Sequence, residues 1–504
     1  MLKTWMTICH FNIKHKNMKI KKLIINNFRA FKHAEIDFDN SNYNFKCLIG
    51  KNDSGKSTIL EALRLFFNYD GIADEYDYNG VIGFLNGMNL QKKTKYHPIS
   101  VSVCFEGENE KLSPFIINGT LTVRKQFEIE PISSKYPYDY SIAVNKSFFD
   151  KGELSKNQLK QTKYLEHYRI PVQAKLQMEG EYIYIPISDI QPLSLSGLFS
   201  TLPKFKLLAA DTPFETIQDE FIKMRFSKDI RSLIRKINKF DINGEEKMRF
   251  GISSVLFSDN NLMTPIKGKS IPLANRGDGI RFFAQSQMFR QLAEKENKRN
   301  LLLAFEEPET HLHPSAQIEM YETIKALSDN PRYQVIITTH SPFIVKELAK
   351  DGIEPIVVNQ EEGSKESEIG QKSDRVLPYV SMNEYIYIAF DEPSIEYHIE
   401  LYGYLQNKLN KNVQEIDNWL KSSGVVKNTH LFNWFDTNRL EKTKDKKSLP
   451  YCVRNNIDHP LVDDVNDSKK HQAYLNNNQF NDKNLIRESI EVLRNAIRIQ
   501  FPIV

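Results

Sequence analysis

The segment Gly50–Ser57, GKNDSGKS, carries the clearest chemical pattern in the sequence. Its glycines, lysine and final serine follow the spacing GxxxxGK[ST] of phosphate-binding loops. Backbone amides that curl around the phosphates, together with the partial positive charge of a helix N-terminus, suit a nucleoside triphosphate. We expect Lys56 to contact the β- and γ-phosphates, Ser57 to ligate Mg²⁺ and Thr58 to contact the α-phosphate. The predicted binding residues of this loop are Gly50, Asn52, Ser54, Gly55, Lys56, Ser57 and Thr58.

An apolar run, Leu301–Phe305, ends in two adjacent acids, Glu306 and Glu307. A buried strand that delivers paired carboxylates to its tip can hold Mg²⁺ and polarise a water molecule. We assign Glu306 to the Mg²⁺ side and Glu307 to the role of general base. Acids also end strands simply as solvated caps, and the nearby phosphate-binding pattern favours the catalytic interpretation.

A second buried run, Val335–Thr339, ends in His340. A histidine at the end of a strand is usually structural. Here the histidine comes about thirty residues after an acid-tipped strand, and we therefore predict that His340 senses the γ-phosphate across the site.

The elements that must position these side chains alternate between strands and helices. Phe45–Ile49 predicts a buried strand before the loop, and Lys56–Phe67 a helix after it. Leu301–Phe305 and Gln334–Thr338 predict further buried strands, and a helix is expected after Pro314. This alternation indicates an α/β fold.

Upstream and downstream regions differ in pattern. Alternation predicts strands at Lys19–Ile25, Lys32–Phe38, Ser100–Phe105 and Leu121–Ile129, with a turn at Asn26–Arg29. Residues from about 136 to 250 are irregular, and we interpret them as an insertion that contains a charged helical stretch.

Three further segments complete the expected organisation. Residues 359–375 predict a surface hairpin or linker, and helices dominate after about 380. We expect residues 1–17 to be an extension that is not necessarily native, 18–380 to be an ATPase-type α/β domain, and 381–504 to be a helical assembly or effector domain. An apolar stripe at helical spacing supports the last assignment: Ile486, Ile490, Leu493 and Ile497.

Composition excludes several classes of protein. The formal net charge of +4 over 504 residues does not indicate a general nucleic-acid binder. The four cysteines are scattered without a CxxC pair, which favours a reducing compartment. No apolar run approaches the roughly 20 residues that cross a bilayer, so we expect a cytoplasmic protein without a membrane partner.

The phrases LIGKNDSGKSTILEAL, FEEPETHLHP and VIITTHSP resemble the ABC-type ATPase family, particularly its RecF-like and OLD-like soluble branch. The resemblance implies ATP and Mg²⁺ as ligands and a homodimer or higher oligomer formed through the ATPase heads. It also implies that Glu309–His313 contact the partner protomer. The pair His311 and His313 is also compatible with a metal site, but we prefer the dimer loop.

The family further implies a signature segment that closes the site from the second copy. Asn275–Arg281 is the only fit, with Gly277, Asp278 and Gly279 predicted to approach the γ-phosphate. The serine usual in the family is absent, and Asn275 lies near its place.

The C-terminal region leaves two interpretations open. A metal-dependent Toprim nuclease domain is disfavoured, because no Asp-x-Asp motif follows the histidine strand. Arg454 and His459 resemble the Arg-x4-His motif of HEPN ribonucleases, but we prefer the interpretation that they are structural residues that join helices.

The runs RGDGIR, NEYIYIAF and LPYCVRNNIDHP resemble the ATPase subunit of Septu-type antiphage systems, which also occurs in retron operons. That resemblance implies an oligomeric ATPase that controls a separate HNH-type nuclease and has DNA or retron RNA/DNA as a further partner. The alternatives are a self-contained ribonuclease toxin gated by the ATPase heads, and a RecF-like DNA-repair ATPase.

Overall fold

The structure is a computed structural model, and it separates into two compact units. The first comprises residues 1–48, 52–340 and 358–369, and the second residues 49–51, 341–357 and 370–504. The structure describes these residues: 18–38, 44–68, 98–127, 138–145, 162–165, 168–171, 177–179, 182–209, 212, 217, 241–242, 246–247, 263–266, 269–272, 275, 277, 281, 284–286, 288–289, 291–292, 300–310, 312–360, 367–370, 374–436, 441–443, 445–459 and 463–503.

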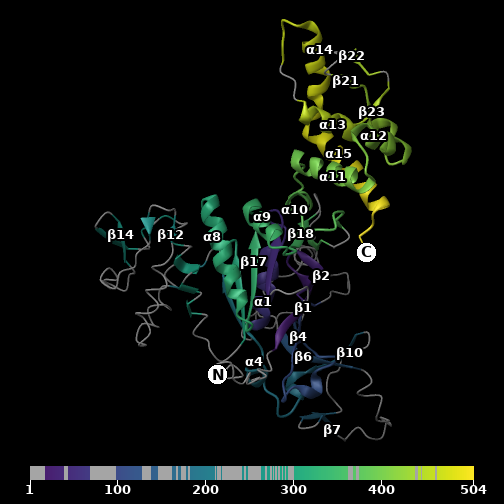
Figure 1. The fold of residues 1–504 in the computed structure, drawn as a ribbon. Helices are drawn as coiled ribbons and strands as arrows, with labels where there is room; N and C mark the ends of the chain where they lie inside the picture. The colour runs from purple at the N-terminus through teal and green to yellow at the C-terminus, as the bar shows by residue number, and fades with distance from the viewer. Residues whose placement is uncertain are drawn as a thin grey trace, which may run out of the picture. The chain divides into compact units, whose positions relative to one another are not determined.

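The first of two large sheets is antiparallel, in the order β2-β1-β4-β5-β6-β10-β9 (Figure 1). Apolar side chains alternate along its strands and face a core, as expected of a sheet with one buried face. The strand bounds are β1 Lys19–Phe28, β2 Phe31–Asp37, β4 Ser100–Glu106, β5 Thr120–Phe127, β6 Tyr138–Asn145, β9 Gln177–Glu179 and β10 Tyr182–Pro186.

The second large sheet has the order β11-β16-β17-β3-β18-β19. β16 pairs in parallel with both β11 and β17, so the tips of these strands share one edge. Its strands β3 and β16 are mostly apolar and are buried along almost their whole length, as expected where both faces of a sheet are covered. The strand bounds are β3 Phe45–Ile49, β11 Lys204–Leu208, β16 Leu301–Glu306, β17 Tyr333–Thr339, β18 Ile356–Gln360 and β19 Ser367–Ile369.

Helix α1 (Lys56–Phe67) contacts strands of both sheets, β1 and β4 on one side and β11 and β16 on the other. The sheets supply the donors for its carboxyl end. Lys125 Nζ, fully buried, donates 2.9 Å hydrogen bonds to the carbonyls of Leu65 and Asn68. Tyr140 Oη donates to the carbonyl of Phe66 at 2.6 Å. Carbonyls at a helix end lack intrahelical partners, so these bonds fix the far end of α1.

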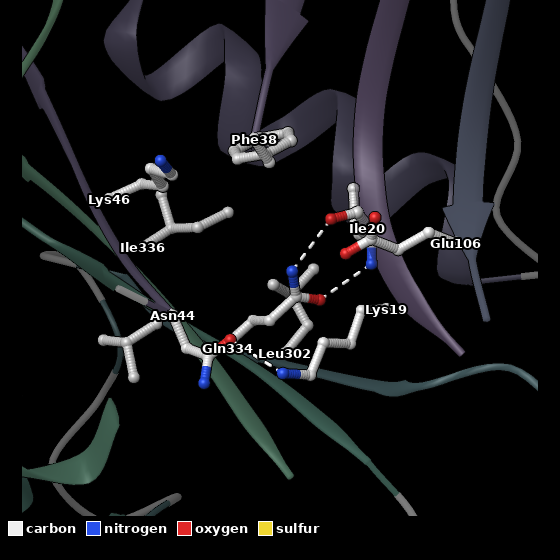
Figure 2. A pocket seen from close by; sticks show the side chains of 10 residues that line it. Lys19, Ile20, Phe38, Asn44, Lys46, Glu106, Leu302, Gln334 and Ile336 are labelled. Carbon is white, nitrogen blue, oxygen red and sulfur yellow. Dashed lines mark hydrogen bonds between the residues drawn. The ribbon is translucent and has the colours of Figure 1, made fainter. Parts of the chain in front are cut away.

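Polar side chains also join the two sheets directly, at the edge where β16 and β17 begin. The Gln334 side chain accepts a hydrogen bond from the Ile20 amide at 2.7 Å and donates to the Ile20 carbonyl at 2.8 Å. Beside it, Lys19 donates to Asn44 at 2.8 Å, and the two contacts line a small pocket (Figure 2). The pocket lies at the opposite ends of these strands from Glu306 and Thr339. It is therefore remote from the predicted chemistry.

The remaining elements of the first unit are short, except α8, which begins at Pro314, where a helix was predicted. Described residues between 281 and 292 are helical, and Phe289 packs edge-on against Phe305. The bounds are η2 Ser113–Phe115, β7 Thr162–Leu165, β8 Tyr168–Pro171, η3 Ile187–Asp189, α4 Leu195–Phe199, β12 Asp241–Ile242, β13 Glu246–Lys247, β14 Met263–Ile266, β15 Lys269–Pro272, α8 Pro314–Lys325 and η6 Ala326–Asp329.

The second unit is mainly helical and contains one apolar core. Long helices α11 and α15 pack together, and the predicted stripe on α15 is buried in this core. The bounds are α9 Pro342–Lys350, α10 Met382–Phe390, α11 Ile395–Leu409, α12 Val413–Ser422, η8 Asn428–His430, β20 Leu431–Phe432, β21 Phe435–Asp436, β22 Glu441–Lys442, β23 Lys447–Ser448, α13 Leu449–Asp458, α14 Ser468–Asn477, η9 Asn478–Asn481 and α15 Lys483–Gln500.

A buried polar network crosses this helical core. Glu384 is fully buried, and its Oε1 accepts hydrogen bonds from the Val376 amide at 2.7 Å and from Tyr397 Oη at 3.2 Å. Arg494 donates to Tyr397 Oη at 2.6 Å and lies 3.8 Å from the Glu384 carboxylate. Opposite charges thus meet inside the core, where an unpaired charge would be costly.

The predicted α/β fold with C-terminal helices is confirmed, with differences in extent. β6 and β10 belong to the antiparallel sheet and β11 pairs with β16. Regular structure therefore reaches into residues 136–250, which the irregular sequence pattern had assigned to an insertion. The predicted hairpin around 359–375 corresponds to the antiparallel pair β18–β19. Residues 1–17 and the predicted charged helix at 214–239, apart from 217, lie outside the described residues. Within the described part of the chain, no helix has the length and apolarity that a membrane crossing needs.

Candidate functional site

The phosphate-binding loop connects the end of β3 to the start of α1. Gly55 is the N-cap of α1 and has a φ of 102°, which side-chain-bearing residues rarely adopt. A Cβ at Gly55 would also lie 3.0 Å from Ser367 Oγ and 3.1 Å from the Phe31 ring. Both the conformation and the lack of space therefore require glycine here. No side chain caps α1, so its first amides face the loop.

Lys56 is the first residue of α1, and its side chain is only 3% exposed. Burial lowers the pKa of the Lys56 ammonium, and the nearby carboxylates of Glu307, Glu309 and Asp53 oppose that effect. Its Nζ lies 4.0 Å from Glu307 Oε1. Ser57, in contrast, is exposed. The loop thus places the buried ammonium of Lys56 beside the exposed hydroxyl of Ser57.

The two acids lie where β16 ends, as predicted. Glu307 has a φ of 43°, in the left-handed region that non-glycine residues rarely adopt. Its amide donates to the carbonyl and to Oγ1 of Thr338, both at 3.1 Å. Its carbonyl accepts from the Thr310 amide at 3.0 Å and from Thr310 Oγ1 at 2.8 Å. Strain of this kind persists only where the surroundings hold it, and it is common at functional sites.

His340 follows β17 and faces these acids. Its Nδ1 lies 3.4 Å from Glu307 Oε1. The hydrogen bond between the two side chains lowers the pKa of the Glu307 carboxyl and raises the pKa of the His340 imidazole. Lys56, Glu307 and His340, which the sequence separates by up to 284 residues, therefore meet at one point.

Glu309 is a member of this site that the sequence analysis did not identify as such. It is 2% exposed, and its Oε1 accepts hydrogen bonds from Thr339 Oγ1 at 2.5 Å and from the His340 amide at 3.0 Å. Its carboxylate is thus used within its own chain, although the family resemblance assigned Glu309–His313 to a loop facing the partner. The sequence marks Glu309 only as a third acid close behind Glu306 and Glu307.

Other predicted residues of the dimer loop and signature lie near the ends of helices or outside the described residues. His313 caps α8, with Nδ1 3.4 Å from the Ser315 amide. Gly277 accepts at its carbonyl from the Arg281 amide, which agrees with a helix starting after it. His311, Asp278 and Gly279 are outside the described residues.

The candidate ribonuclease pair lies on α13 in the second unit. Arg454 Nη2 forms an ion pair with Asp458 at 2.6 Å, and Nη1 donates to Asn455 at 3.0 Å. His459 is the exposed C-cap residue of the same helix. Arg454 is thus engaged locally in this chain.

Comparison with known proteins agrees with this geometry. A family model described as AAA ATPase domain matches residues 18–188 and 206–345, more than half of the chain. The chain belongs to the AAA ATPase domain family. The match runs through much of the region of residues 136–250, consistent with the sheet pairing of β6, β10 and β11.

Three curated relatives are similar to this AAA ATPase. The Old nuclease of Escherichia phage P2 is 24% identical over 64% of this chain and 56% of its own length. Endonuclease GajA of Bacillus cereus is 25% identical over 66% of this chain and 57% of its own. The DNA replication and repair protein RecF of Rickettsia canadensis is 44% identical over 11% of this chain and 15% of its own. This chain thus spans little more than half the length of the first two.

The residues of this AAA ATPase suit a magnesium nucleotide. Among the described residues there is no group of three or more His, Cys, Asp or Glu side chains that could hold a metal alone. One hydroxyl and one carboxylate, Ser57 and Glu306, suit Mg²⁺, which usually takes few protein ligands and completes its shell with water and phosphate oxygens. The buried Lys56 and the uncapped amides of α1 supply the matching positive charge.

Proposed function

We propose that this AAA ATPase binds Mg²⁺-ATP and hydrolyses it at the edge formed by the phosphate loop, β16 and β17. The observation that supports this most strongly is the meeting of buried Lys56, strained Glu307 and His340 within 4.0 Å. The Glu307 carboxylate lies 4.0 Å from Lys56 Nζ and 3.4 Å from His340 Nδ1, where phosphate oxygens would compete for the same partners.

Each residue then has a defined task. Lys56 holds the β- and γ-phosphates, and Ser57 and Glu306 hold Mg²⁺, which neutralises charge on the phosphate oxygens. Glu307 accepts the proton of the attacking water, and His340 donates to the γ-phosphate. Phosphoryl transfer depends mainly on such positioning and charge stabilisation.

The site is proposed to close by dimerisation of two heads. Gly277, Asp278 and Gly279 of a second copy would approach the γ-phosphate with backbone amides. This explains why Ser57 and His340 are exposed in the single chain.

Nucleotide-dependent pairing is proposed to control a nuclease in antiphage defence. The support is the similarity to proteins named Old nuclease and Endonuclease GajA. We propose that the nuclease is a separate, HNH-type partner, as the resemblance to Septu-type ATPase subunits implies.

Calorimetry and turnover assays with Mg²⁺ test the ATPase proposal. Wild type is expected to bind and hydrolyse ATP, Lys56→Ala to lose binding, and Glu307→Gln to bind ATP without turnover and to accumulate as a dimer. Lys51→Ala, in the same loop but with an exposed side chain, serves as the matched lysine control. Normal hydrolysis by Glu307→Gln would show that another group is the base.

Co-expression with neighbouring genes tests the partner proposal separately. A nuclease that co-purifies with wild type, and whose activity changes with ATP, is expected. Failure of any nuclease to co-purify would remove the partner model and leave the ATPase proposal standing.

A further inference from the structure

Glu309 connects the tips of two strands that both contribute to the candidate site. It lies in the turn after β16, where its carbonyl accepts from the Leu312 amide at 3.0 Å. Its carboxylate reaches the end of β17, thirty residues later in the sequence. The link therefore ties the loop that carries Glu307 to the residue that carries the imidazole.

At the end of β17, the Glu309 carboxylate contacts the side chain of Thr339 and the backbone of His340. Glu309 Oε1 accepts from Thr339 Oγ1 at 2.5 Å and from the His340 amide at 3.0 Å, and lies 3.6 Å from His340 Nδ1. Two donors from neighbouring residues, the Thr339 hydroxyl and the His340 amide, thus converge on one carboxylate oxygen. Such a contact fixes the position of the His340 backbone at the end of the strand. It therefore also fixes the point from which the imidazole side chain extends.

Burying the Glu309 carboxylate costs free energy. Glu309 is 2% exposed, and Thr339 is fully buried. A buried carboxylate loses its hydration, and here burial raises the pKa of Glu309 while the bond from Thr339 lowers it. An apolar side chain would fill the same space without that cost.

We propose that Glu309 is a positioning residue for ATP hydrolysis, which holds His340 at the height and angle at which its ring meets Glu307 and the γ-phosphate. The inference rests on the proposed ATPase function and adds a residue to it. Glu309 acts through His340 and does not touch the nucleotide itself.

A kinetic cycle with His340 tests this inference. Glu309→Ala is expected to lower kcat for ATP by about 100-fold, as small misplacements at reacting centres do. KM should stay within about threefold of wild type, since ground-state binding by Lys56 is retained. The double variant Glu309→Ala/His340→Ala should be no slower than His340→Ala alone, because both changes remove the same contribution.

Conservative variants separate positioning from general damage. Glu309→Gln keeps one oxygen acceptor and should recover most of the lost turnover, and Thr339→Ser should recover what Thr339→Val loses. Ser341→Ala is the matched stability control, because it removes the side-chain cap of α9 from the next residue and leaves the Glu309 bonds in place. It should lower stability by about 1 kcal/mol without the kcat effect.

One readout needs no turnover at all. The amide proton resonance of His340, measured by NMR in nucleotide-free protein, should move upfield in Glu309→Ala and stay close to wild type in Glu309→Gln. If Glu309→Ala does not fold, the Thr339→Val and Thr339→Ser pair gives the same comparison.

The outcomes distinguish the inference from the function beneath it. Additive effects in the cycle, or an unchanged His340 amide in Glu309→Ala, would overturn the role of Glu309 while ATP hydrolysis stands. Absence of ATP hydrolysis in wild type would overturn the proposed function, and the amide resonance would still report whether Glu309 holds His340.

Discussion

Lys125 Nζ donates a 2.9 Å hydrogen bond to the carbonyl of Leu65, in the last turn of the helix that begins at the phosphate-binding loop. The ammonium is fully buried and lies 4.2 Å from the ring centre of Tyr138. A cation at the negative end of a helix, placed against an aromatic face, is stabilised by both. α1 is thereby held at the end opposite to its nucleotide site.

Lys125→Met should lower the free energy of unfolding by about 2 kcal/mol, because it removes the donor to the carbonyls of Leu65 and Asn68. The loss is measured by thermal melting of the two proteins side by side. Lys32→Met, at an exposed position on β2, is the control and should change stability by no more than about 0.5 kcal/mol. Equal melting temperatures for all three proteins would show that the buried ammonium contributes nothing net.

Acid sensitivity of the second unit should depend on His398. Its Nε2 is 2.9 Å from Ser489 Oγ in the helical core, and burial, helped by the charge of Arg454, lowers its pKa from 6.5 to about 3. Because the unfolded chain takes up this proton at higher pH than the folded chain, stability is lost as pH falls below 6.5. Between pH 7 and pH 5 the loss is about 2 kcal/mol.

The measurement is urea unfolding followed by tryptophan fluorescence, since Trp419 and Trp434 lie in the same unit. His398→Leu should be less stable than wild type at pH 7 and should show a smaller drop on acidification. A drop of equal size in both proteins would contradict the assignment.

The pair Glu307–His340 predicts an opposite dependence for the nucleotide-free site. The raised pKa of His340 contributes stability that is complete below 6.5 and lost as pH rises through its folded value. The lowered pKa of Glu307 contributes stability that is complete above 4.5 and lost as pH falls through its folded value. The contribution of the pair to the stability of the fold is therefore largest between pH 4.5 and 6.5.

Since His340 is 42% exposed, the effect should stay below about 1 kcal/mol. The melting temperature of wild type should exceed that of His340→Gln by more at pH 5.5 than at pH 9. A constant difference would indicate that the two side chains do not interact in solution.

Arg454 and His459 permit a test of ribonuclease activity. Because Arg454 is paired with Asp458 on its own helix, Arg454→Ala should cost less than about 1 kcal/mol of stability and leave ATP turnover unchanged. We expect wild type and both alanine variants to leave transfer RNA intact. Cleavage by wild type that both variants lose would instead support the HEPN-like alternative.

The fold around the loop was predictable because local signals agree there. A short, mostly apolar segment, a glycine loop and an amphipathic segment define β3 and α1 with the bounds that the structure shows. The β1–β2 turn lies later than predicted, since Asn27 and Arg29 take up positive φ and extend the pairing to Phe28 and Phe31.

Strands whose partners are distant in sequence were harder to predict. β11 is a short, lysine-containing segment, KFKLL, and it becomes an edge strand of the sheet only by pairing with β16 almost a hundred residues later. Lys125 lies on the same face of β5 as Leu121, Val123 and Phe127, and only the carboxyl end of α1 explains why a lysine is buried there.

The site shows the same limit. Lys56, Glu306, Glu307 and His340 were placed by motif, since each has a characteristic neighbour pattern. The role of Glu309 depends on a hydroxyl thirty residues away, and nothing in the spacing of two separate segments reveals that contact.

The hydrogen bonds between Gln334 and Ile20 help to set the register of β1. A strand with alternating apolar residues could slide by two positions and still bury the same face. Such a slide would leave the Gln334 amide opposite another residue, and it would also part Lys19 from Asn44 and the Met18 carbonyl from Asn300. These polar contacts with the neighbouring sheet therefore select one register of β1, where apolar packing alone would allow several.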